Sequence, residues 1–273
     1  MRWSSRIGVG AGVGLGALVG VGWAGLKVEP APFPPHREHT GPLESTPIPD
    51  DLPPPVARYF SATAGNRLPR IGSAVVTGQA QLRLFGLTFP SRVRFTHLVG
   101  QGYRHYIEST WFGYPIVKVN EWYLDGRARM ELPFGVVANE PKADMAANLN
   151  LWGEAIWFPS AFVDRRVRWE AVDDATARLI VPFERSEDSL MVRFDGATGL
   201  IQWMEAMRYR DAKDDAKIPW RFESREWRTF HGLLVPSNGA IQWMDQREPW
   251  FVMSVEDVAY NVDVSQYIRS SGL

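Results

Sequence analysis

Apolar and polar residues alternate along most of the chain from Ser73 onward, with the period of two that is typical of β-strands. Turns rich in Gly, Asn and Asp separate many of these runs, which indicates an antiparallel meander. The alternation predicts strands at residues 76–84, 90–99, 103–111, 114–124, 127–134, 167–172, 176–182, 189–195, 200–210, 217–229, 233–245 and 250–262.

One stretch has helical spacing instead. Asp144 is a plausible N-cap and Pro159 a stop, and between them apolar residues recur every three or four positions at Met145, Leu149, Trp152 and Ile156. We therefore predict a helix over 144–158, and a shorter one near 55–64. The expected fold is mainly β, a single curved antiparallel sheet of roughly 10–12 strands, or half-barrel, plugged by one or two helices and preceded by a transmembrane helix.

A short sequence, Ile-Gln-Trp-Met, occurs twice, at 201–204 and at 241–244. The match fails just outside these segments, which favours two strands in similar environments over a duplicated site. We expect Trp203 and Trp243 to lie on the same face of one sheet.

The amino terminus predicts a membrane anchor. Residues 7–26 are uncharged and, as a helix, would span about 30 Å, the thickness of a bilayer core. Arg2 and Arg6 precede the stretch and only Lys27 follows it closely, which predicts a cytoplasmic amino terminus and an exported remainder in a single-pass protein of the cytoplasmic membrane. A cleaved signal peptide is the alternative.

Three parts follow from these patterns: an anchor at 1–27, a linker at 28–55 and a β-rich domain at 56–265. The linker contains ten prolines and reads as an extended stalk between membrane and domain.

Composition removes several classes of function. The net charge of −1 leaves no excess of basic residues for nucleic acid, and the absence of Cys excludes disulfides, thiolate nucleophiles and Cys-ligated zinc. No phosphate-cradling glycine loop, G-x-S-x-G elbow or H-E-x-x-H pair is present. We expect no cofactor.

The segment Glu154-Ala155-Ile156-Trp157-Phe158-Pro159-Ser160-Ala161 resembles the E-A-x-W-F-P-[TS]-A signature of an uncharacterised bacterial family. Flanking pieces, such as Pro219-Trp220, extend the resemblance over about residues 50–262. The Arg of the family's usual Arg-Tyr-Leu before the Glu-Ala pair is missing, so any role of that Arg does not carry over. The pattern is similar to periplasmic lipoprotein carriers (LolA-like half-barrels), which implies a fold and not a function.

Glu154 is the sharpest candidate for chemistry. It is expected opposite the apolar helical stripe and beside Trp157, where a carboxylate can have a raised pKa and act as an acid or base. A structural Glu, exposed or paired with an Arg, is the alternative.

His97 and His105 are a weaker candidate for a metal site. A three-residue loop at 100–102 would place them directly opposite each other on neighbouring strands. Zinc needs a third ligand, and no residue nearby on that face offers one, so packing histidines are the simpler interpretation.

The many aromatic residues favour a binding function. In a carrier, these residues would line an apolar cavity. The ligand-binding candidates are Trp111, Trp152, Trp157, Trp203 and Trp243. The leading hypothesis is a membrane-anchored, extracytoplasmic binding or carrier module for a lipid or other hydrophobic ligand. The alternatives are an envelope enzyme that uses Glu154 and a structural or partner-binding protein with a solid core.

Overall fold

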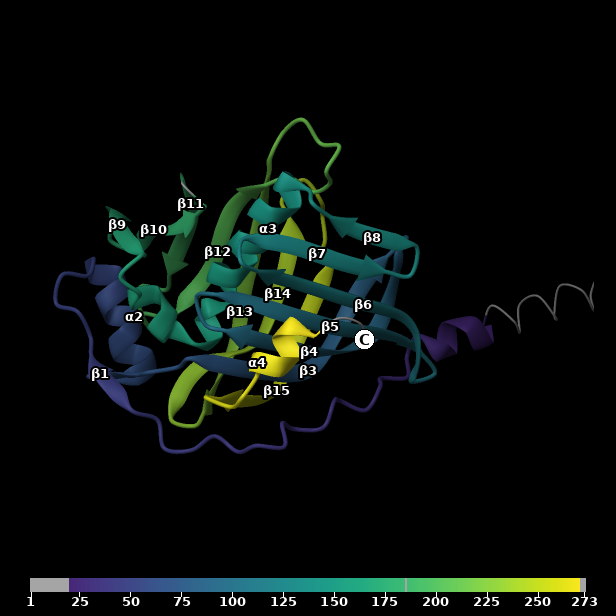
Figure 1. The fold of residues 1–273 in the computed structure, drawn as a ribbon, viewed down its shortest axis with the longest axis horizontal. Coiled ribbons are helices and arrows are strands. Elements are labelled where there is room, and N and C mark those ends of the chain that lie inside the picture. Colours follow the sequence, from purple (N-terminus) through teal and green to yellow (C-terminus); the bar gives the residue numbers. More distant parts are fainter. Residues whose placement is uncertain (1–19, 185, 271–273) are drawn as a thin grey trace, which may run out of the picture.

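The computed structural model describes residues 20–184 and 186–270. One antiparallel sheet of thirteen strands dominates it (Figure 1). The first half of the sheet consists of β3 (Ser73–Leu84), β4 (Leu87–Leu98), β5 (Gly102–Trp111), β6 (Tyr114–Leu124), β7 (Arg127–Leu132) and β8 (Gly135–Ala138). The second half consists of β9 (Arg168–Asp173), β10 (Thr176–Phe183), β11 (Ser186–Phe194), β12 (Ile201–Arg208), β13 (Ile218–Phe230), β14 (Leu233–Trp243) and β15 (Phe251–Tyr260).

Two meanders meet at the pairing of β3 with β15, so the strand order runs from β8 through β3, then from β15 to β9. At this seam Gly78 faces the backbone of Ser254, and a Cβ there would lie 2.1 Å from the Ser254 carbonyl oxygen. The two outermost strands are β8 and β9, so the sheet is not closed. Its mainly β, single-sheet architecture confirms the predicted class. All twelve predicted strands are present in this sheet, and β8 is its one additional strand within the described residues.

The sheet curves around α3 (Pro141–Gly153), which contacts β6 and β7 in one half and β10, β11 and β12 in the other. The helix α2 (Pro54–Ala64) packs on β10, β11 and β14. Two 3₁₀ turns, η1 (Glu154–Trp157) and η2 (Pro159–Val163), continue from α3. A core of buried side chains from these helices and the concave face of the sheet fills the space between them.

The predicted helix over 144–158 differs from α3 at both ends. The helix begins at Pro141 with Glu140 at its N-cap position, and Asp144 lies inside the first turn, buried against β7. It ends at Gly153, where the backbone tightens into η1. A 3₁₀ turn has three residues per turn in place of 3.6, so helical-wheel positions beyond Gly153 do not hold.

The proline-rich segment is extended but does not stand away from the domain. Phe33 is buried, and its ring lies 4.4 Å from the Arg92 guanidinium on the convex face of β4. Thr40 accepts a hydrogen bond from the backbone of Tyr260. Further along, β1 (Ser45–Pro47) pairs with β2 (Arg67–Pro69), and α4 (Ser265–Arg269) packs near β4 and β5.

Only the end of the predicted anchor falls within the described residues, where 20–25 are helical. Among the helices of residues 20–184 and 186–270, none has the length and apolarity that a bilayer crossing requires. The transmembrane helix at 7–26 therefore stays a prediction, most of which lies outside the described residues.

Candidate functional site

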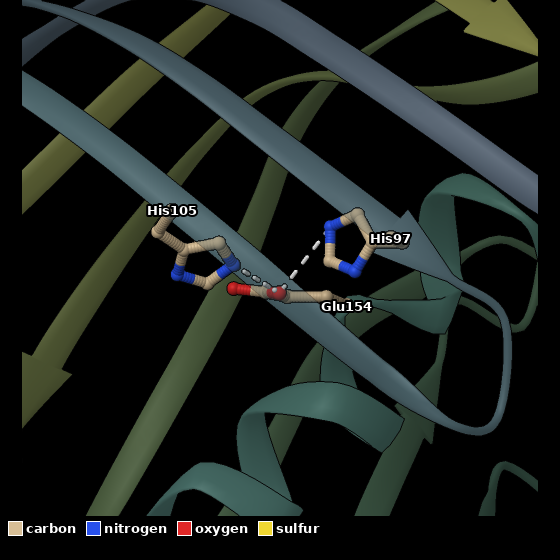
Figure 2. Close-up of side chains that lie close together, drawn as sticks. All are labelled: His97, His105 and Glu154. Carbon is tan, nitrogen blue, oxygen red and sulfur yellow. Dashed lines mark hydrogen bonds and ion pairs between the residues drawn. The ribbon is translucent and has the colours of Figure 1, made fainter. Parts of the chain in front are cut away.

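Glu154 is the first residue of η1 and extends toward the concave faces of β4 and β5 (Figure 2). Its side chain is directed into the protein and not to solvent. The Glu154 side chain is 14% exposed.

His97 and His105 both point at this carboxylate, from β4 and β5 (Figure 2). Nε2 of His105 lies 2.9 Å, and Nε2 of His97 3.5 Å, from Oε2 of Glu154. The expectation that the histidines face each other directly is wrong: His97 pairs with Tyr103, and His105 with Phe95. The loop closes one residue earlier, over 99–101, so the two histidines are diagonal neighbours with ring centres 5.7 Å apart.

No third ligand was expected on the strand face that carries the two histidines, and the third candidate ligand, Glu154, comes from η1 instead. The ligand atoms of His97, His105 and Glu154 all lie within 4.8 Å of one another. Glu154 is 49 residues from His105 in the sequence and reaches it only because the sheet curves around the exit of α3.

Burial sets the protonation of this cluster. It raises the pKa of Glu154 to about 7, although the nearby imidazole of His97 acts in the opposite direction. Burial lowers the pKa of His97 and of His105 well below the usual histidine value, so both imidazoles are neutral at pH 7. His97 is fully buried, and neither ring nitrogen has a hydrogen-bond partner within the described residues.

Other polar groups surround the cluster. Tyr103 stacks on His105, with ring centres 4.1 Å apart, and donates a short hydrogen bond to Glu121. Arg208, on β12, donates to Asn150 at 2.6 Å, and its guanidinium lies 4.4 Å from the ring centre of Trp220. Burial lowers the pKa of Arg208, and no ion pair to it forms among the described residues.

A cavity of about 480 Å³ lies next to these polar residues, between α3 and the two halves of the sheet. Glu154, His105 and Arg208 contribute to its lining, and apolar side chains provide much of the remainder, namely Phe95, Ile107, Met130, Leu132, Val137, Trp220, Ile241, Trp243, Trp250 and Phe251. A smaller hollow of about 30 Å³ lies beside Trp157. The predicted solid-core alternative therefore lacks support.

The five tryptophans predicted to bind ligand have different positions. Trp243 lines the cavity and Trp157 the smaller hollow beside it. Trp152 is buried in the core, where the Arg166 guanidinium lies over its ring. Trp111 is exposed and donates to the carbonyl of Gly22.

Trp203 lies on the convex face, under the guanidinium of Arg221. It pairs with Glu223, which pairs with Ala240, three residues from Trp243. Residues an odd number apart in a strand point to opposite faces, so the expectation that Trp203 and Trp243 share a face is wrong. The ladder shifts at Phe194, which brings Ile201 and Met204 into the core together and turns Trp203 outward.

Three polar residues of the site were not predicted from the sequence, namely Arg208, Tyr103 and Glu121. A signal was available for Arg208. It continues the alternate positions of the buried Met204 and Ala206 on a predicted strand, and a charge at such a position indicates a buried polar site.

Comparison with solved structures finds distant similarities. A LolA superfamily protein of Nitrosomonas europaea is 9% identical, with a TM-score of 0.46 over 80% of this chain and 96% of that one. A DUF1329 family protein of Desulfovibrio piger is 14% identical, with a TM-score of 0.41 over 73% of this chain and 90% of that one. A domain of Vibrio parahaemolyticus described as an outer membrane lipoprotein-sorting protein is 10% identical, with a TM-score of 0.41 over 78% of this chain and 92% of that one.

The search of curated proteins gave no match. A family model, described as a family of unknown function (DUF6544), matches residues 43–254, which include the Glu-Ala-x-Trp-Phe-Pro-Ser-Ala segment. The family resemblance predicted from that segment is confirmed, and the chain belongs to this DUF6544 family.

Proposed function

We propose that this protein is a membrane-anchored, extracytoplasmic binding module that holds an amphipathic ligand, such as a lipid with an acidic head, between α3 and the sheet. The cavity of about 480 Å³ carries the proposal. Binding sites for small molecules typically have volumes of about 300–1,000 Å³, mostly apolar walls and a few polar groups.

The apolar wall accounts for the body of the ligand. Trp220, Trp243 and Phe251 come from three neighbouring strands, and Trp250 directly precedes the third. Met130, Leu132 and Val137 come from the opposite side. Large apolar side chains around an open space lose the contacts that a packed core would give them. An apolar chain or ring inside the cavity restores those contacts.

Arg208 accounts for the polar end. A buried guanidinium without an ion pair is unfavourable, because its charge loses hydration and gains no opposite charge in return. Glu121 and Glu154 attract it electrostatically, but neither lies within ion-pair distance in the described structure. A carboxylate or phosphate of a ligand would supply the missing partner.

The membrane anchor and the location are part of the proposal and rest on sequence. Residues 7–26 have the length and apolarity of a transmembrane helix, and Arg2 and Arg6 favour a cytoplasmic amino terminus. The domain would then lie on the outer side of the cytoplasmic membrane.

An acid-base enzyme is the second candidate, because the Glu154 carboxylate lies in the cavity wall and bonds to His105. The two candidates differ in what happens to the ligand. A carrier releases it unchanged, and an enzyme converts it.

Native mass spectrometry of the full-length protein in detergent, with organic extraction of the same sample, tests the proposal. We expect the mass of the protein to be increased by that of a bound lipid-like compound, and the same compound to appear in the extract. Repeated recovery of the protein without ligand, together with failure to take up added long-chain fatty acid, would contradict it. Conversion of added ligand to a new mass would favour the enzyme.

A further inference from the structure

The cluster of His97, His105 and Glu154 has the composition of a metal site. Two imidazole nitrogens and one carboxylate oxygen converge from two adjacent strands and a 3₁₀ turn, all of them packed in the core (Figure 2). Ligand atoms of a tetrahedral zinc ion lie about 3.3 Å apart, given bonds of about 2.0–2.1 Å. The distances from Oε2 of Glu154, 2.9 Å to His105 and 3.5 Å to His97, lie on either side of that value.

His97 supplies a second, independent observation. Its side chain is fully buried, and both ring nitrogens lack hydrogen-bond partners among the described residues. Buried polar atoms nearly always have a partner, so an orphan imidazole directed at a carboxylate indicates a missing ligand. A cation between the three groups would satisfy it.

We propose that His97, His105 and Glu154 bind one divalent transition-metal ion of the zinc class. Two imidazoles and one carboxylate are a common ligand set for zinc and leave one coordination position open. His105 and Glu154 line the large cavity, so a water molecule or a ligand atom can reach that position. The site stands independently of what the apolar part of the cavity holds.

Metal uptake by the full-length protein tests this site. The protein, purified without a polyhistidine tag and stripped with chelator, is titrated with Zn²⁺ by calorimetry and with Co²⁺ by visible absorption. We expect one equivalent of metal and a Co²⁺ spectrum of low coordination number. Glu154→Gln and His105→Gln keep side-chain size but remove a ligand, and should weaken binding at least about tenfold.

The chain offers a matched control for the imidazoles. Its other three histidines are His36 and His39 in the proline-rich segment and His231, which bonds to the carbonyl of Val258. The triple variant of these to Gln should bind metal as the wild type does. Thermal melting of each variant separates loss of a ligand from loss of fold. Absence of stoichiometric uptake by the wild type, or equal uptake by folded Glu154→Gln, would overturn the proposal.

A different observation concerns one end of the sheet. Three hairpin turns there place Phe at their tips: Phe85 between β3 and β4, Phe112 between β5 and β6, and Phe134 between β7 and β8. Phe85 is 86% and Phe134 71% exposed, and their rings contact each other. Tyr114, Ile116 and Val136 extend the patch, which we call the aromatic rim.

Two of these turns have an unfavourable backbone. Phe85 and Phe112 have φ values of 51° and 50°, in the left-handed region, and each precedes a Gly that also has positive φ. Such turns prefer Asn-Gly or Asp-Gly, and a bulky residue in this conformation is strained. Exposed aromatics in strained turns contribute little to the fold, which indicates a role outside it.

We further propose that the aromatic rim inserts into the surface of the membrane that residues 7–26 enter. The described helix at 20–25 meets this end of the sheet: Trp111 donates to the carbonyl of Gly22, and Phe112 to that of Gly25 (Figure 1). Trp and Tyr side chains favour the membrane interface, and Phe side chains bury their apolar surface at the boundary between headgroups and acyl chains. The proposal rests on the membrane anchorage proposed above.

The absence of Cys allows site-specific labelling. Leu87→Cys is exposed beside the rim, at the start of β4, and Gln101→Cys is exposed at the opposite end of β4. Each full-length variant carries a polarity-sensitive fluorophore in phosphatidylglycerol and phosphatidylcholine vesicles that contain spin-labelled acyl chains. We expect strong quenching at position 87 and little at 101, and weaker quenching at 87 when Phe85→Ser and Phe134→Ser are added.

Two failures can be told apart. Protein that does not fractionate with the vesicles would contradict the anchorage. Anchored protein with equal, weak quenching at positions 87 and 101 would contradict rim insertion alone.

Discussion

The Asp144 carboxylate accepts a hydrogen bond from the backbone N–H of Ala128, at 2.7 Å, and so joins α3 to the first residues of β7. Its other oxygen accepts from Arg127 at 2.7 Å. Asp144 is buried, and this pair of bonds fixes the helix that forms one wall of the cavity.

We expect Asp144→Ala to lower the free energy of unfolding by about 2–3 kcal/mol, because it leaves a buried N–H without a partner. Urea denaturation followed by tryptophan fluorescence measures this. Asp215→Ala, at an exposed loop position, is the control and should change stability by less than about 0.5 kcal/mol. Equal effects of the two substitutions would show that Asp144 does not join the elements energetically.

Asp164 gives the protein a defined pH dependence. The hydrogen bond from Arg166 lowers the pKa of Asp164 below its usual value of 3.8, and Arg166 also donates to the carbonyl of Gly100, in the hairpin that carries both site histidines. A lowered folded-state pKa contributes stability that is present above the unfolded value and lost as pH falls through the folded value.

We expect Asp164→Asn to lower the free energy of unfolding by about 0.5–1 kcal/mol at pH 7, a small value because the pair is partly exposed. The difference from wild type should persist at pH 5 and shrink below about pH 4, in denaturant titrations at each pH. A difference that stays constant to pH 3.5 would mean that the charge of Asp164 is not its source.

Arg208 is predicted to select the polar end of the ligand. The wild-type protein should bind a long-chain fatty acid about tenfold more tightly than the alcohol of equal length, since hydrogen bonds to charged groups contribute about 1.5–3 kcal/mol. Arg208→Met keeps an unbranched side chain against Trp220 and should remove this preference. Arg129→Met changes another cavity residue, one that is half-exposed and paired with Glu131, and should keep it. Competition against a fluorescent fatty acid gives both affinities.

Most of the sheet could be predicted from the sequence, because its signals are local. Alternation sets the strands, and turns such as Asp125-Gly126 set their ends. β8 was missed because its four residues, Gly-Val-Val-Ala, have no alternation and follow a turn without Asn or Asp. The pairing of β3 with β15 could not be predicted either, because it joins the first and the last strand of the sheet along the sequence.

The site could be predicted only in part, because its geometry depends on contacts between distant segments. Glu154 and the two histidines were each identified, but as separate candidates. Their convergence depends on the curvature of the sheet around α3. It also depends on the hairpin loop, which lies at 99–101 and not at the predicted 100–102. Trp203 and Trp243 show the same limit: in identical Ile-Gln-Trp-Met segments the two Trp side chains face opposite ways, because a bulge at Gln202 interrupts only the first segment.

The central claim is that a ligand occupies the cavity beside α3, and a cavity-filling substitution tests it most directly. Ala146, on α3, lines the cavity, and Ala62, on α2, is exposed to solvent and outside it. The measurement is the affinity of the full-length protein for a fluorescent long-chain fatty acid, for wild type, Ala146→Phe and Ala62→Phe in the same detergent. We predict at least about a tenfold loss for Ala146→Phe, because the added ring takes the ligand's volume, and no change for Ala62→Phe. Equal affinity of all three folded proteins would contradict the claim.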